Sequence, residues 1–319
     1  MTTRVRMGVI GLGAMGSELL SAAVDHPEVE VVAVADISAD VVDRLLREHP
    51  GLRGGTDPDA VATASQVDAV YIATPPAFHA ALAERAMRAG KHVFCEKPLA
   101  VDLAEGEAMV ALAAETGLVG AVNFALADRA AALEVERALQ AGEVGAVESV
   151  TIRLAFPEWP REFQRDAAWL ARGEQGGFVR EVFSHFAFVT DRLLGPLTLE
   201  SATVDRPAPA DAETRVEAGF TAAGVPVVLQ GEVKVGLAET YEWEIVGARR
   251  SYRLTNWGDL SASDGEGWTL VDPPGARGSE ATRLSAFANA VRGEGLVNLA
   301  DFAAALRVQR VVEGVLASR

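Results

Sequence analysis

The chain has 319 residues and a mass of 33.6 kDa, which at about 150 residues per domain corresponds to two domains, each with its own core. Hydrophobic residues make up 49% and charged residues 23% of it, which is typical of a folded globular protein and excludes low-complexity and disulfide-stapled chains. The formal net charge of −16 repels phosphate backbones and anionic lipid surfaces, so we expect neither nucleic acid nor membrane as a partner.

The single cysteine, Cys95, cannot form an internal disulfide, and with five scattered histidines it offers no Cys/His cluster, so we expect no bound metal. The N-terminal apolar stretch is interrupted by glycines and lacks a small-residue cleavage site, which argues against a signal peptide. No stretch reaches the roughly 18 apolar residues that cross a bilayer. We therefore expect a cytoplasmic protein.

The first part of the chain alternates short β-branched runs with longer Ala- and Leu-rich stretches at helical spacing, which is typical of βαβ units. The predicted strands are Val5–Ile10, Val29–Ala35, Ala69–Ala73, His92–Cys95 and Val119–Asn123, and the predicted helices are Ala14–Val24, Ala39–Glu48, His79–Ala89 and Leu103–Thr116. Such short apolar strands are buried on both faces of a parallel sheet. The pattern predicts an α/β Rossmann domain, a doubly wound parallel sheet, over residues 1–125.

The second part follows a predicted linking helix, Ala130–Ala141, and contains longer strands with alternating apolar residues. The predicted elements are the strands Val147–Phe156, Leu199–Val204, Thr214–Ala222, Val225–Lys234, Tyr241–Val246 and Ser251–Asn256, and the helices Phe183–Leu194, Ser279–Val291 and Asp301–Leu316. Alternation favours an antiparallel sheet, with a hairpin at Ala222–Val225. We expect an α+β domain with a mostly antiparallel sheet over residues 126–319, whose C-terminal helices pack back onto one of the domains.

A glycine motif, Gly11-Leu-Gly-Ala-Met-Gly16, directly follows the first predicted strand, and Asp36 ends the second. In this pattern the first glycine makes a tight turn, the second lets a pyrophosphate approach the backbone, and the third allows close packing of helix and strand. The predicted cofactor-binding residues here are Gly11, Gly13, Ala14, Met15, Gly16 and Asp36. Because Asp36 would bind ribose hydroxyls and repel a 2′-phosphate, NAD is favoured as the cofactor, with NADP not excluded.

Two further motifs close predicted strands: Ala73-Thr-Pro-Pro-Ala-Phe-His79 and Cys95-Glu-Lys-Pro98. Ligands of doubly wound sheets bind at the carboxyl ends of the strands, so we expect the cofactor site to include Thr74, Pro75, His79, Glu96 and Lys97. For His79 the alternative is a structural role in the first turn of a helix. Cys95 is expected to be a small buried side chain.

Together, GLGAMG, Asp36, ATPPAFH and above all FCEKPLA resemble the glucose–fructose oxidoreductase, inositol dehydrogenase and rhizopine-catabolism (Gfo/Idh/MocA) family of nicotinamide oxidoreductases. The resemblance continues in Gly176-Gly-Phe-Val-Arg-Glu-Val-Phe-Ser-His185, with Gly195 ten residues beyond the histidine. It is strong through about residue 125 and again over 176–195. The resemblance implies a substrate-binding and oligomerising second domain and a homodimer or homotetramer.

The resemblance also implies which residues are catalytic. Lys97 matches the lysine that contacts nicotinamide and the reacting oxygen, His185 matches the histidine given the proton-transfer role, and Glu181 stands where an aspartate is commoner. Glu181 and His185 at positions i and i+4 would share one helix face. We expect His185 to be the acid/base, since an imidazole titrates near neutral pH, and Lys97 to orient the substrate. The alternative is that His185 is a core histidine among phenylalanines.

The chain departs from the family pattern at Phe188 and around Asn123, where polar residues are replaced by apolar ones. Fewer groups then remain to bind the hydroxyls of a free sugar. Four arginines cluster before His185, namely Arg161, Arg165, Arg172 and Arg180. They either recognise an anionic or bulkier substrate, with Trp159 or Trp169 as an apolar wall, or are solvated surface residues. The candidate substrate residues are Asn123, Trp169 and Arg180.

These observations predict reversible hydride transfer between NAD(H) and a secondary alcohol or ketone of a sugar-like, cyclitol or related small molecule. Two alternatives stay open. A C=N (imine) reductase would use the same cofactor on a less hydroxylated substrate, and an NAD-binding sensor or scaffold would use it without catalysis.

Overall fold

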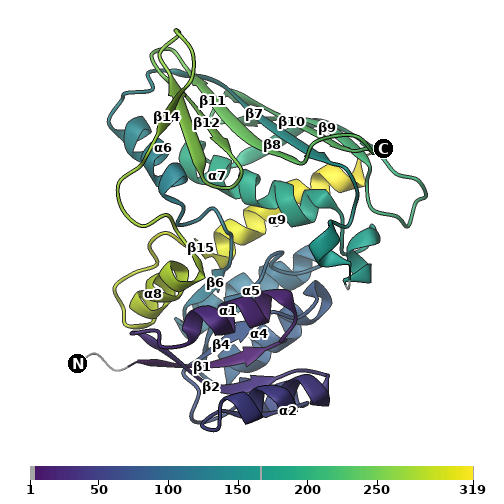
Figure 1. Cartoon of the computed structure of the whole chain (residues 1–319), viewed down its shortest axis with the longest axis vertical. Coiled ribbons are helices and arrows are strands. Elements are labelled where there is room, and N and C mark those ends of the chain that lie inside the picture. The colour runs from purple at the N-terminus through teal and green to yellow at the C-terminus, as the bar shows by residue number, and fades with distance from the viewer. Residues whose placement is uncertain (1–3, 166, 319) are drawn as a thin grey trace. The chain divides into compact units, whose positions relative to one another are not determined.

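The computed structural model describes residues 4–165 and 167–318 and separates into two compact units (Figure 1). The first comprises Met1–Phe124 and Gly278–Leu306, and the second comprises Ala125–Arg277 and Arg307–Arg319. The C-terminal segment Gly278–Leu306 thus belongs to the N-terminal unit. The functional domains predicted over residues 1–125 and 126–319 are each one continuous segment, whereas each structural unit combines two segments. The assignment of functions to these domains stays a prediction.

The first unit is built on a sheet with the strand order β15-β6-β5-β4-β1-β2-β3. Its strands are β1 (Val5–Ile10), β2 (Val29–Ala35), β3 (Arg53–Gly55), β4 (Ala69–Ile72), β5 (His92–Cys95), β6 (Gly120–Val122) and β15 (Ala300–Asp301). All neighbours are parallel except the short antiparallel pair of β15 and β6. Because β1 lies between β4 and β2, the order of the strands reverses beside β1, which is where ligands of such sheets bind.

Helices cover both faces of this sheet (Figure 1). They are α1 (Ala14–Ala23), α2 (Ala39–Glu48), α3 (Pro58–Ala62), the 3₁₀ turn η1 (Pro76–Phe78), α4 (His79–Arg88), α5 (Leu103–Thr116) and α8 (Glu280–Val291). On one face Met7 and Val9 of β1 share a core with Leu19 of α1 and Phe287 of α8. On the other face a Cβ added at Gly8 would lie 2.5 Å from Val61 of α3. Successive side chains of β1 point to opposite faces of the sheet, so β1 contributes residues to a core on each face.

The second unit is built on a sheet with the order β14-β13-β12-β11-β7-β10-β9-β8, in which only β7 and β10 are parallel. Its strands are β7 (Val147–Phe156), β8 (Leu197–Asp205), β9 (Arg215–Ala222), β10 (Val225–Val233), β11 (Thr240–Gly247), β12 (Ser251–Thr255), β13 (Asp259–Ser263) and β14 (Thr269–Val271). Its helical elements are α6 (Ala130–Gln140), η2 (Glu162–Gln164), η3 (Ala168–Ala171), the π-helical turn η4 (Val179–Phe183), α7 (Ser184–Leu194) and the part of α9 (Phe302–Ala317) from Arg307 onward. Side chains along β9 and β11 alternate between buried and accessible, so one face of the sheet forms the core.

The predicted fold class is confirmed, and β7 has the predicted bounds. The predicted hairpin is also confirmed, since Ala222 pairs with Val225 and both connecting residues, Ala223 and Gly224, have left-handed φ angles of 48° and 83°. The sequence analysis missed β3, α3, β13, β14 and β15, which are too short to show a period. It also began the helix of His185 at Phe183, whereas the π turn starts it at Val179.

Cys95 is a buried free cysteine in β5. Within residues 4–165 and 167–318, no group of three or more His, Cys, Asp or Glu side chains is arranged to hold a metal ion. None of the helices in this part of the chain has the length and apolarity needed to cross a bilayer.

Candidate active site

The glycine loop after β1 combines two tightly packed glycines with one open position. Gly11 has a φ angle of 93°, and a Cβ there would lie 2.5 Å from the Ala73 carbonyl oxygen. A Cβ on Gly16 would collide with the Gly11 carbonyl. A Cβ on Gly13 would meet no atom within 4 Å. Gly11 therefore lets the loop approach Ala73 after β4, Gly16 lets α1 approach the loop, and Gly13 leaves a cradle open at the start of α1.

This start of α1 suits an anion. Gly13 is the N-cap and makes no side-chain capping bond, and the first turn carries no acidic residue. Asp36, at the end of β2, holds the loop through hydrogen bonds that its carboxylate accepts from the backbone N–H groups of Leu12 at 2.7 Å and Ser38 at 2.9 Å. Each carboxylate oxygen keeps acceptor capacity for a ribose hydroxyl. These residues fit a dinucleotide with its pyrophosphate at the helix N-terminus.

Thr74 and His79 follow β4 at the same edge of the sheet. The Thr74 hydroxyl oxygen is buried and has no hydrogen-bond partner in the described part of the chain. The ring of His79 is buried between two backbone carbonyl oxygens, with Nδ1 at 2.8 Å from that of Pro98 and Nε2 at 2.9 Å from that of Thr74. Burial lowers the pKa of His79. His79 thus links the two motif loops, and a direct contact with the cofactor remains a prediction for it.

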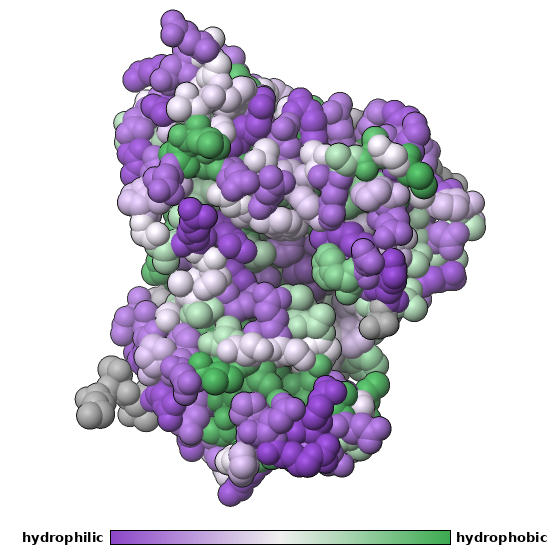
Figure 2. Space-filling view, viewed as in Figure 1, coloured by the Kyte–Doolittle hydropathy of each residue, from purple (hydrophilic) through white to green (hydrophobic). Residues whose placement is uncertain are grey.

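Large apolar side chains are exposed beside the carboxyl ends of three strands. Met15 follows β1, Ile37 follows β2 and Phe78 follows β4, with exposed fractions of 38%, 94% and 56%. Figure 2 shows apolar surface among hydrophilic residues over the first unit. Exposed apolar groups at a ligand-binding edge provide surface against which planar rings can pack.

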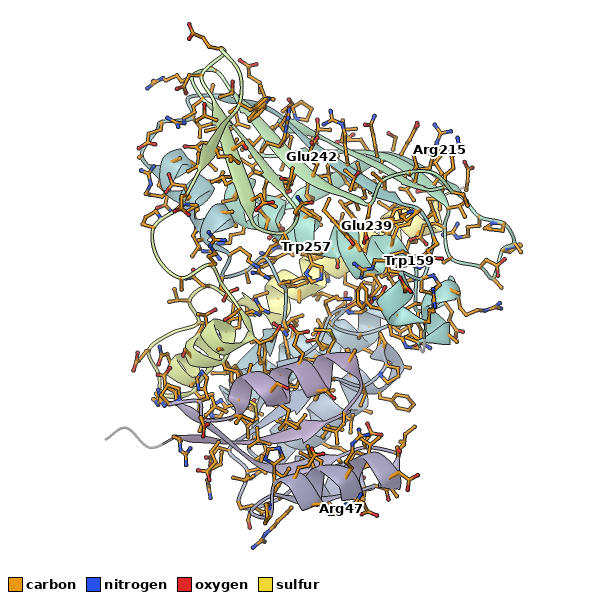
Figure 3. All side chains as sticks on the ribbon, viewed as in Figure 1. Arg47, Trp159, Arg215, Glu239, Glu242 and Trp257 are labelled. Carbon is orange, nitrogen blue, oxygen red and sulfur yellow. The ribbon has the colours of Figure 1, made fainter. Side chains whose placement is uncertain are left out.

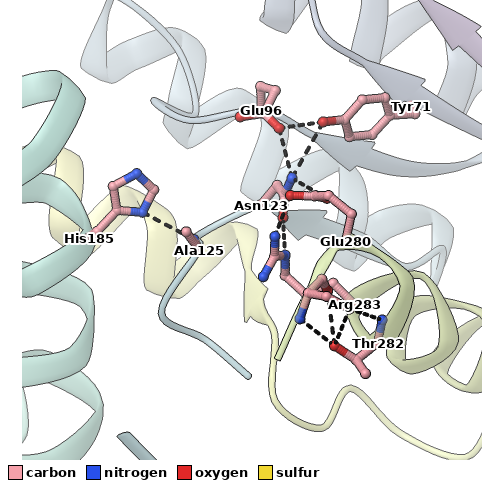
Figure 4. Close-up of polar contacts among 9 residues, drawn as sticks. Tyr71, Glu96, Asn123, Ala125, His185, Glu280, Thr282 and Arg283 are labelled. Carbon is pink, nitrogen blue, oxygen red and sulfur yellow. Dashed lines mark hydrogen bonds and ion pairs between the residues drawn. The ribbon is translucent and has the colours of Figure 1, made fainter. Parts of the chain in front are cut away.

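A buried polar cluster lies under the Glu96–Lys97 loop (Figure 4). Tyr71 donates a hydrogen bond to the Glu96 carboxylate, and the side-chain amide nitrogen of Asn123 donates to Glu96 at 2.8 Å and to Glu280 at 3.1 Å. Arg283 donates to the Asn123 carbonyl oxygen at 2.7 Å and forms an ion pair with Glu280. Burial, and then repulsion from Glu280, raise the pKa of Glu96 to about 7.

This cluster anchors the strand end from which Lys97 projects. Lys97 directly follows Glu96 and is half-buried. Asn123, a predicted substrate residue, uses both ends of its amide inside the cluster. Glu280 and Arg283 come from α8, far away in the chain, and the sequence analysis did not single them out. The only sequence feature at this place is the cap Ser279, which starts α8 with a capping box.

His185 and Glu181 lie in the second unit. Nδ1 of His185 accepts a hydrogen bond from the backbone N–H of Ala125 at 3.1 Å (Figure 4), and the ring stands at 84° to that of Trp257 with 5.2 Å between centroids. Glu181 lies in the π turn four residues earlier and accepts a hydrogen bond from Gln164 at 3.3 Å. Both residues are buried. π turns inside helices are frequent at functional sites.

The glycine pair before this turn makes room for a buried carboxylate. Glu213 accepts a hydrogen bond from the backbone N–H of Val179 at 2.7 Å, at the start of the π turn, and burial raises its pKa. Gly177 has a φ angle of 94°, and a Cβ there would collide with the Glu213 carboxylate. A Cβ on Gly176 would collide with the backbone of Leu170. The sequence analysis missed Glu213.

Two of the clustered arginines have different surroundings. Arg180 is buried, pairs with Glu313 at 2.7 Å and donates to the carbonyl oxygens of Gly173 and Gly176. Its guanidinium is thus engaged inside the second unit. Arg161 donates to the Tyr241 hydroxyl at 2.9 Å and lies over the ring of Phe163. The predicted wall residue Trp169 is half-buried in η3.

Aromatic rings connect Arg161 and His185 within the second unit. Ring contacts run in the order Trp159, Phe156, Tyr241, Trp257 and His185. Trp159 and Trp257 lie on the same side of the sheet (Figure 3). Trp257 is held there by the turn between β12 and β13, with a left-handed φ of 66° that a bulky side chain rarely adopts. The sequence analysis missed Trp257, although Asn-Trp-Gly between two strand runs is a turn pattern.

The predicted site residues therefore fall into two sets. The cofactor residues and Lys97 surround the strand ends of the first unit, and Glu181 and His185 share the start of one helix in the second.

Comparisons with known proteins show the family of the chain. The sequence model of an oxidoreductase family with an NAD-binding Rossmann fold matches residues 5–124. A dTDP-3,4-didehydro-2,6-dideoxy-alpha-D-glucose 3-reductase from Streptomyces violaceoruber is 30% identical, covering 98% of this chain and 94% of its own. An inositol 2-dehydrogenase from Rhizobium meliloti is 32% identical over 60% of this chain and 55% of its own. A 3-ketoreductase from Actinomadura kijaniata, solved with NADP and TDP-benzene, has a TM-score of 0.84 at 25% identity, covering 98% of this chain and 97% of that one.

The similarity to the Streptomyces reductase extends over nearly the whole chain, and the family match covers the glycine loop and the Glu96–Lys97 loop. The predicted cofactor class, NAD or NADP, and the predicted oxidoreductase activity are confirmed. The chain is an NAD(P)-dependent oxidoreductase and belongs to the Gfo/Idh/MocA family.

Proposed function

We propose that this oxidoreductase interconverts a secondary alcohol and its ketone on a sugar-like, cyclitol or related small molecule. The observation that carries the proposal is the cradle at Gly13, bordered by the Asp36 carboxylate and the buried Thr74 hydroxyl. When bound there, the nicotinamide cofactor supplies or accepts the hydride. The sugar-like substrate class is supported by the names of the two relatives, a ketosugar reductase and an inositol dehydrogenase.

We assign the chemistry at the substrate oxygen to Lys97 and His185, with Glu181 as a supporting carboxylate. Lys97 brings a positive charge from a strand end that the buried cluster holds in place. His185 brings an imidazole whose orientation is set by Ala125 and Trp257. The remaining wall of the substrate site is proposed to be the aromatic row with Arg161, a surface suited to a large or anionic substituent.

The experiment is a panel of substrates followed by NADH absorbance. It contains free cyclitols, free sugars and their keto forms, nucleotide-linked ketosugars, and cyclic imines. Turnover of a sugar or cyclitol compound is expected. Turnover of imines alone would favour the C=N reductase, and NADH binding without any turnover would favour a sensor or scaffold.

The cofactor preference is proposed to be NAD, because the Asp36 carboxylate would repel a 2′-phosphate. The expected result is tighter binding of NADH than of NADPH by the wild-type protein. In Asp36→Ser the ratio of the Kd for NADPH to the Kd for NADH should fall about tenfold or more. The substitution removes a like-charge repulsion of a few kcal/mol between the carboxylate and the 2′-phosphate. Equal affinities of the wild-type protein for both cofactors, measured by titration calorimetry, would contradict the preference.

We further propose a cytoplasmic homodimer or homotetramer that associates through the outer face of the second unit's sheet. This face includes the accessible Val228 of β10, with an exposed fraction of 40%. Light scattering after size exclusion measures the oligomeric state. Val228→Arg is expected to lower it, and a wild-type monomer at micromolar concentration would contradict the proposal.

A further inference from the structure

The ring of His185 is held by two contacts that fix its orientation. The backbone N–H of Ala125 donates to Nδ1 at 3.1 Å, and the ring of Trp257 meets the imidazole at 84° (Figure 4 shows the first contact). His185 is 6% exposed. Ala125 begins the turn that follows β6, and Trp257 is presented by the turn between β12 and β13. The first contact is made by a backbone group and the second by a side-chain ring, and both residues lie in turns of the second unit.

The contact with Ala125 decides where the proton of the imidazole resides. A backbone N–H can only donate, so the ring nitrogen that faces it must carry a lone pair. The neutral ring then carries its proton on Nε2. A second proton on Nδ1 would bring two N–H groups together, break the hydrogen bond and leave a buried donor unsatisfied.

The same contact limits what Glu181 can do. A carboxylate orients a histidine base by accepting a hydrogen bond from its Nδ1–H. Here Nδ1 is an acceptor and is already used by Ala125. Glu181 therefore cannot form that pair with His185 in this arrangement, although it lies four residues earlier in the same helical segment.

We infer that His185 acts on the substrate oxygen as a neutral hydrogen-bond donor through Nε2–H, and neither gains nor loses a proton in the reaction. This inference rests on the proposed function and differs from the acid/base role predicted from the sequence. When a ketone is reduced, a hydride that the reduced nicotinamide would supply adds to the carbonyl carbon, and the C=O π electron pair moves to oxygen. That oxygen takes a proton from the Lys97 ammonium, which regains one from water, while Nε2–H stabilises the developing negative charge. Oxidation runs the same steps in reverse.

The imidazole stays neutral in this role because Nδ1 accepts a hydrogen bond from a backbone N–H. A single donor aimed at a developing oxyanion in a site shielded from water accounts for about 10²–10³ in turnover number. This effect on the turnover number requires only an N–H donor and does not require a group that titrates. A side-chain amide at the position of Nε2 should therefore substitute for the ring.

Three substitutions test this. Gln can place an N–H near the position of Nε2, Asn reaches only the position of Nδ1, and Ala offers no polar group. We expect His185→Gln to keep kcat within about tenfold of wild type, and His185→Asn and His185→Ala to lose about 10²–10³, with the Kd for NADH unchanged in all three. A kcat of His185→Gln as low as that of His185→Ala would overturn the inference.

Nitrogen-15 NMR of the histidine-labelled wild-type protein tests the tautomer without any substrate. Comparison with His185→Gln assigns the resonances of His185 among the five histidines of the chain. We expect at pH 7 a protonated Nε2 and an unprotonated Nδ1. A ring protonated on Nδ1, whether neutral or cationic, would overturn the inference. If the tautomer is as expected but no alcohol or ketone is turned over by the wild-type protein, the proposed function fails, and with it the donor role but not the tautomer.

Discussion

Thr74 shows how a single side chain can point to a ligand. Its hydroxyl oxygen is buried without a hydrogen-bond partner in the described part of the chain. Leaving such a group unsatisfied costs about 1–3 kcal/mol of folding free energy. The backbone carbonyl oxygen of Thr74 lies 2.9 Å from Nε2 of His79, and this contact fixes the position of the residue. A bound cofactor that forms a hydrogen bond with this hydroxyl would offset this loss of free energy.

We expect Thr74→Val to weaken NADH binding about three- to tenfold, the value of one net hydrogen bond. The free protein should be as stable as wild type or slightly more stable, because the substitution removes an unsatisfied buried oxygen. Titration calorimetry and urea denaturation measure the two effects.

Thr190→Val is the matched control in the second unit. The Thr190 hydroxyl donates to the Phe186 carbonyl and accepts from Trp243. This variant should lose stability and leave NADH affinity unchanged. If Thr74→Val behaves in the same way, the Thr74 hydroxyl has a structural and not a cofactor-binding role.

The helical segment made of η4 and α7 carries Glu181 and His185, two of the predicted catalytic residues. Gly176 and Gly177 precede this segment, and their lack of a side chain lets Leu170 and Glu213 approach the backbone closely. Glu213 then binds the N–H of Val179. The wider π turn follows and carries Glu181, and the α-helix after it carries His185. A side chain added at the glycine pair is therefore expected to move both of these predicted catalytic residues.

Gly177→Ala should lower the free energy of unfolding by about 2–5 kcal/mol. A left-handed backbone costs an alanine about 1–2 kcal/mol, and forcing a methyl group against the Glu213 carboxylate adds about 1–3 kcal/mol. Gly142→Ala is the matched control, because Gly142 has a φ of 71° and a Cβ there would meet no atom within 4 Å. It should show the conformational cost alone. Equal losses for both variants in urea denaturation would mean that the approach of Glu213 does not require the glycine.

At the scale of the whole molecule, the buried cluster makes stability depend on pH. The pKa of Glu96 is raised from 4.5 to about 7 in the folded protein, first by burial and then by Glu280. Between these two values the folded state holds a proton that the unfolded state releases. The contribution of Glu96 to stability is therefore fully present below about pH 4.5 and is lost as the pH rises to about 7.

The expected loss across this range is about 1–3 kcal/mol relative to Glu96→Gln. Glutamine keeps the acceptor oxygen that faces Tyr71 and Asn123 but does not titrate. The measurement is urea denaturation of both proteins at several pH values from 4.5 to 7.5. Parallel curves of unfolding free energy against pH would contradict the raised pKa, since groups that are not coupled to Glu96 cancel in the difference.

The sequence by itself determined the elements that carry a strong local pattern. The parallel strands are continuous apolar runs, and the strands of the second sheet alternate apolar and polar residues. The glycine loop lies between a strand and a helix with the spacing typical of a dinucleotide-binding turn. The motifs around Lys97 and His185 led to the prediction that these two residues are catalytic. Short elements such as β3 and α3 were not, since three to five residues show no period.

Tertiary structure decided what depends on residues far apart in the chain. Phe287 of α8 stacks on Phe94 of β5 at 5.1 Å, so the C-terminal segment completes the first core. Glu280 and Arg283 reach Asn123 from that segment, and Glu213 reaches the glycine pair across 36 residues of chain. The N–H of Ala125 meets His185 across 60 residues. Local propensity reports only neighbours in sequence, whereas burial, hydrogen-bond partners and the proton position on an imidazole are set by groups that only the completed fold brings together.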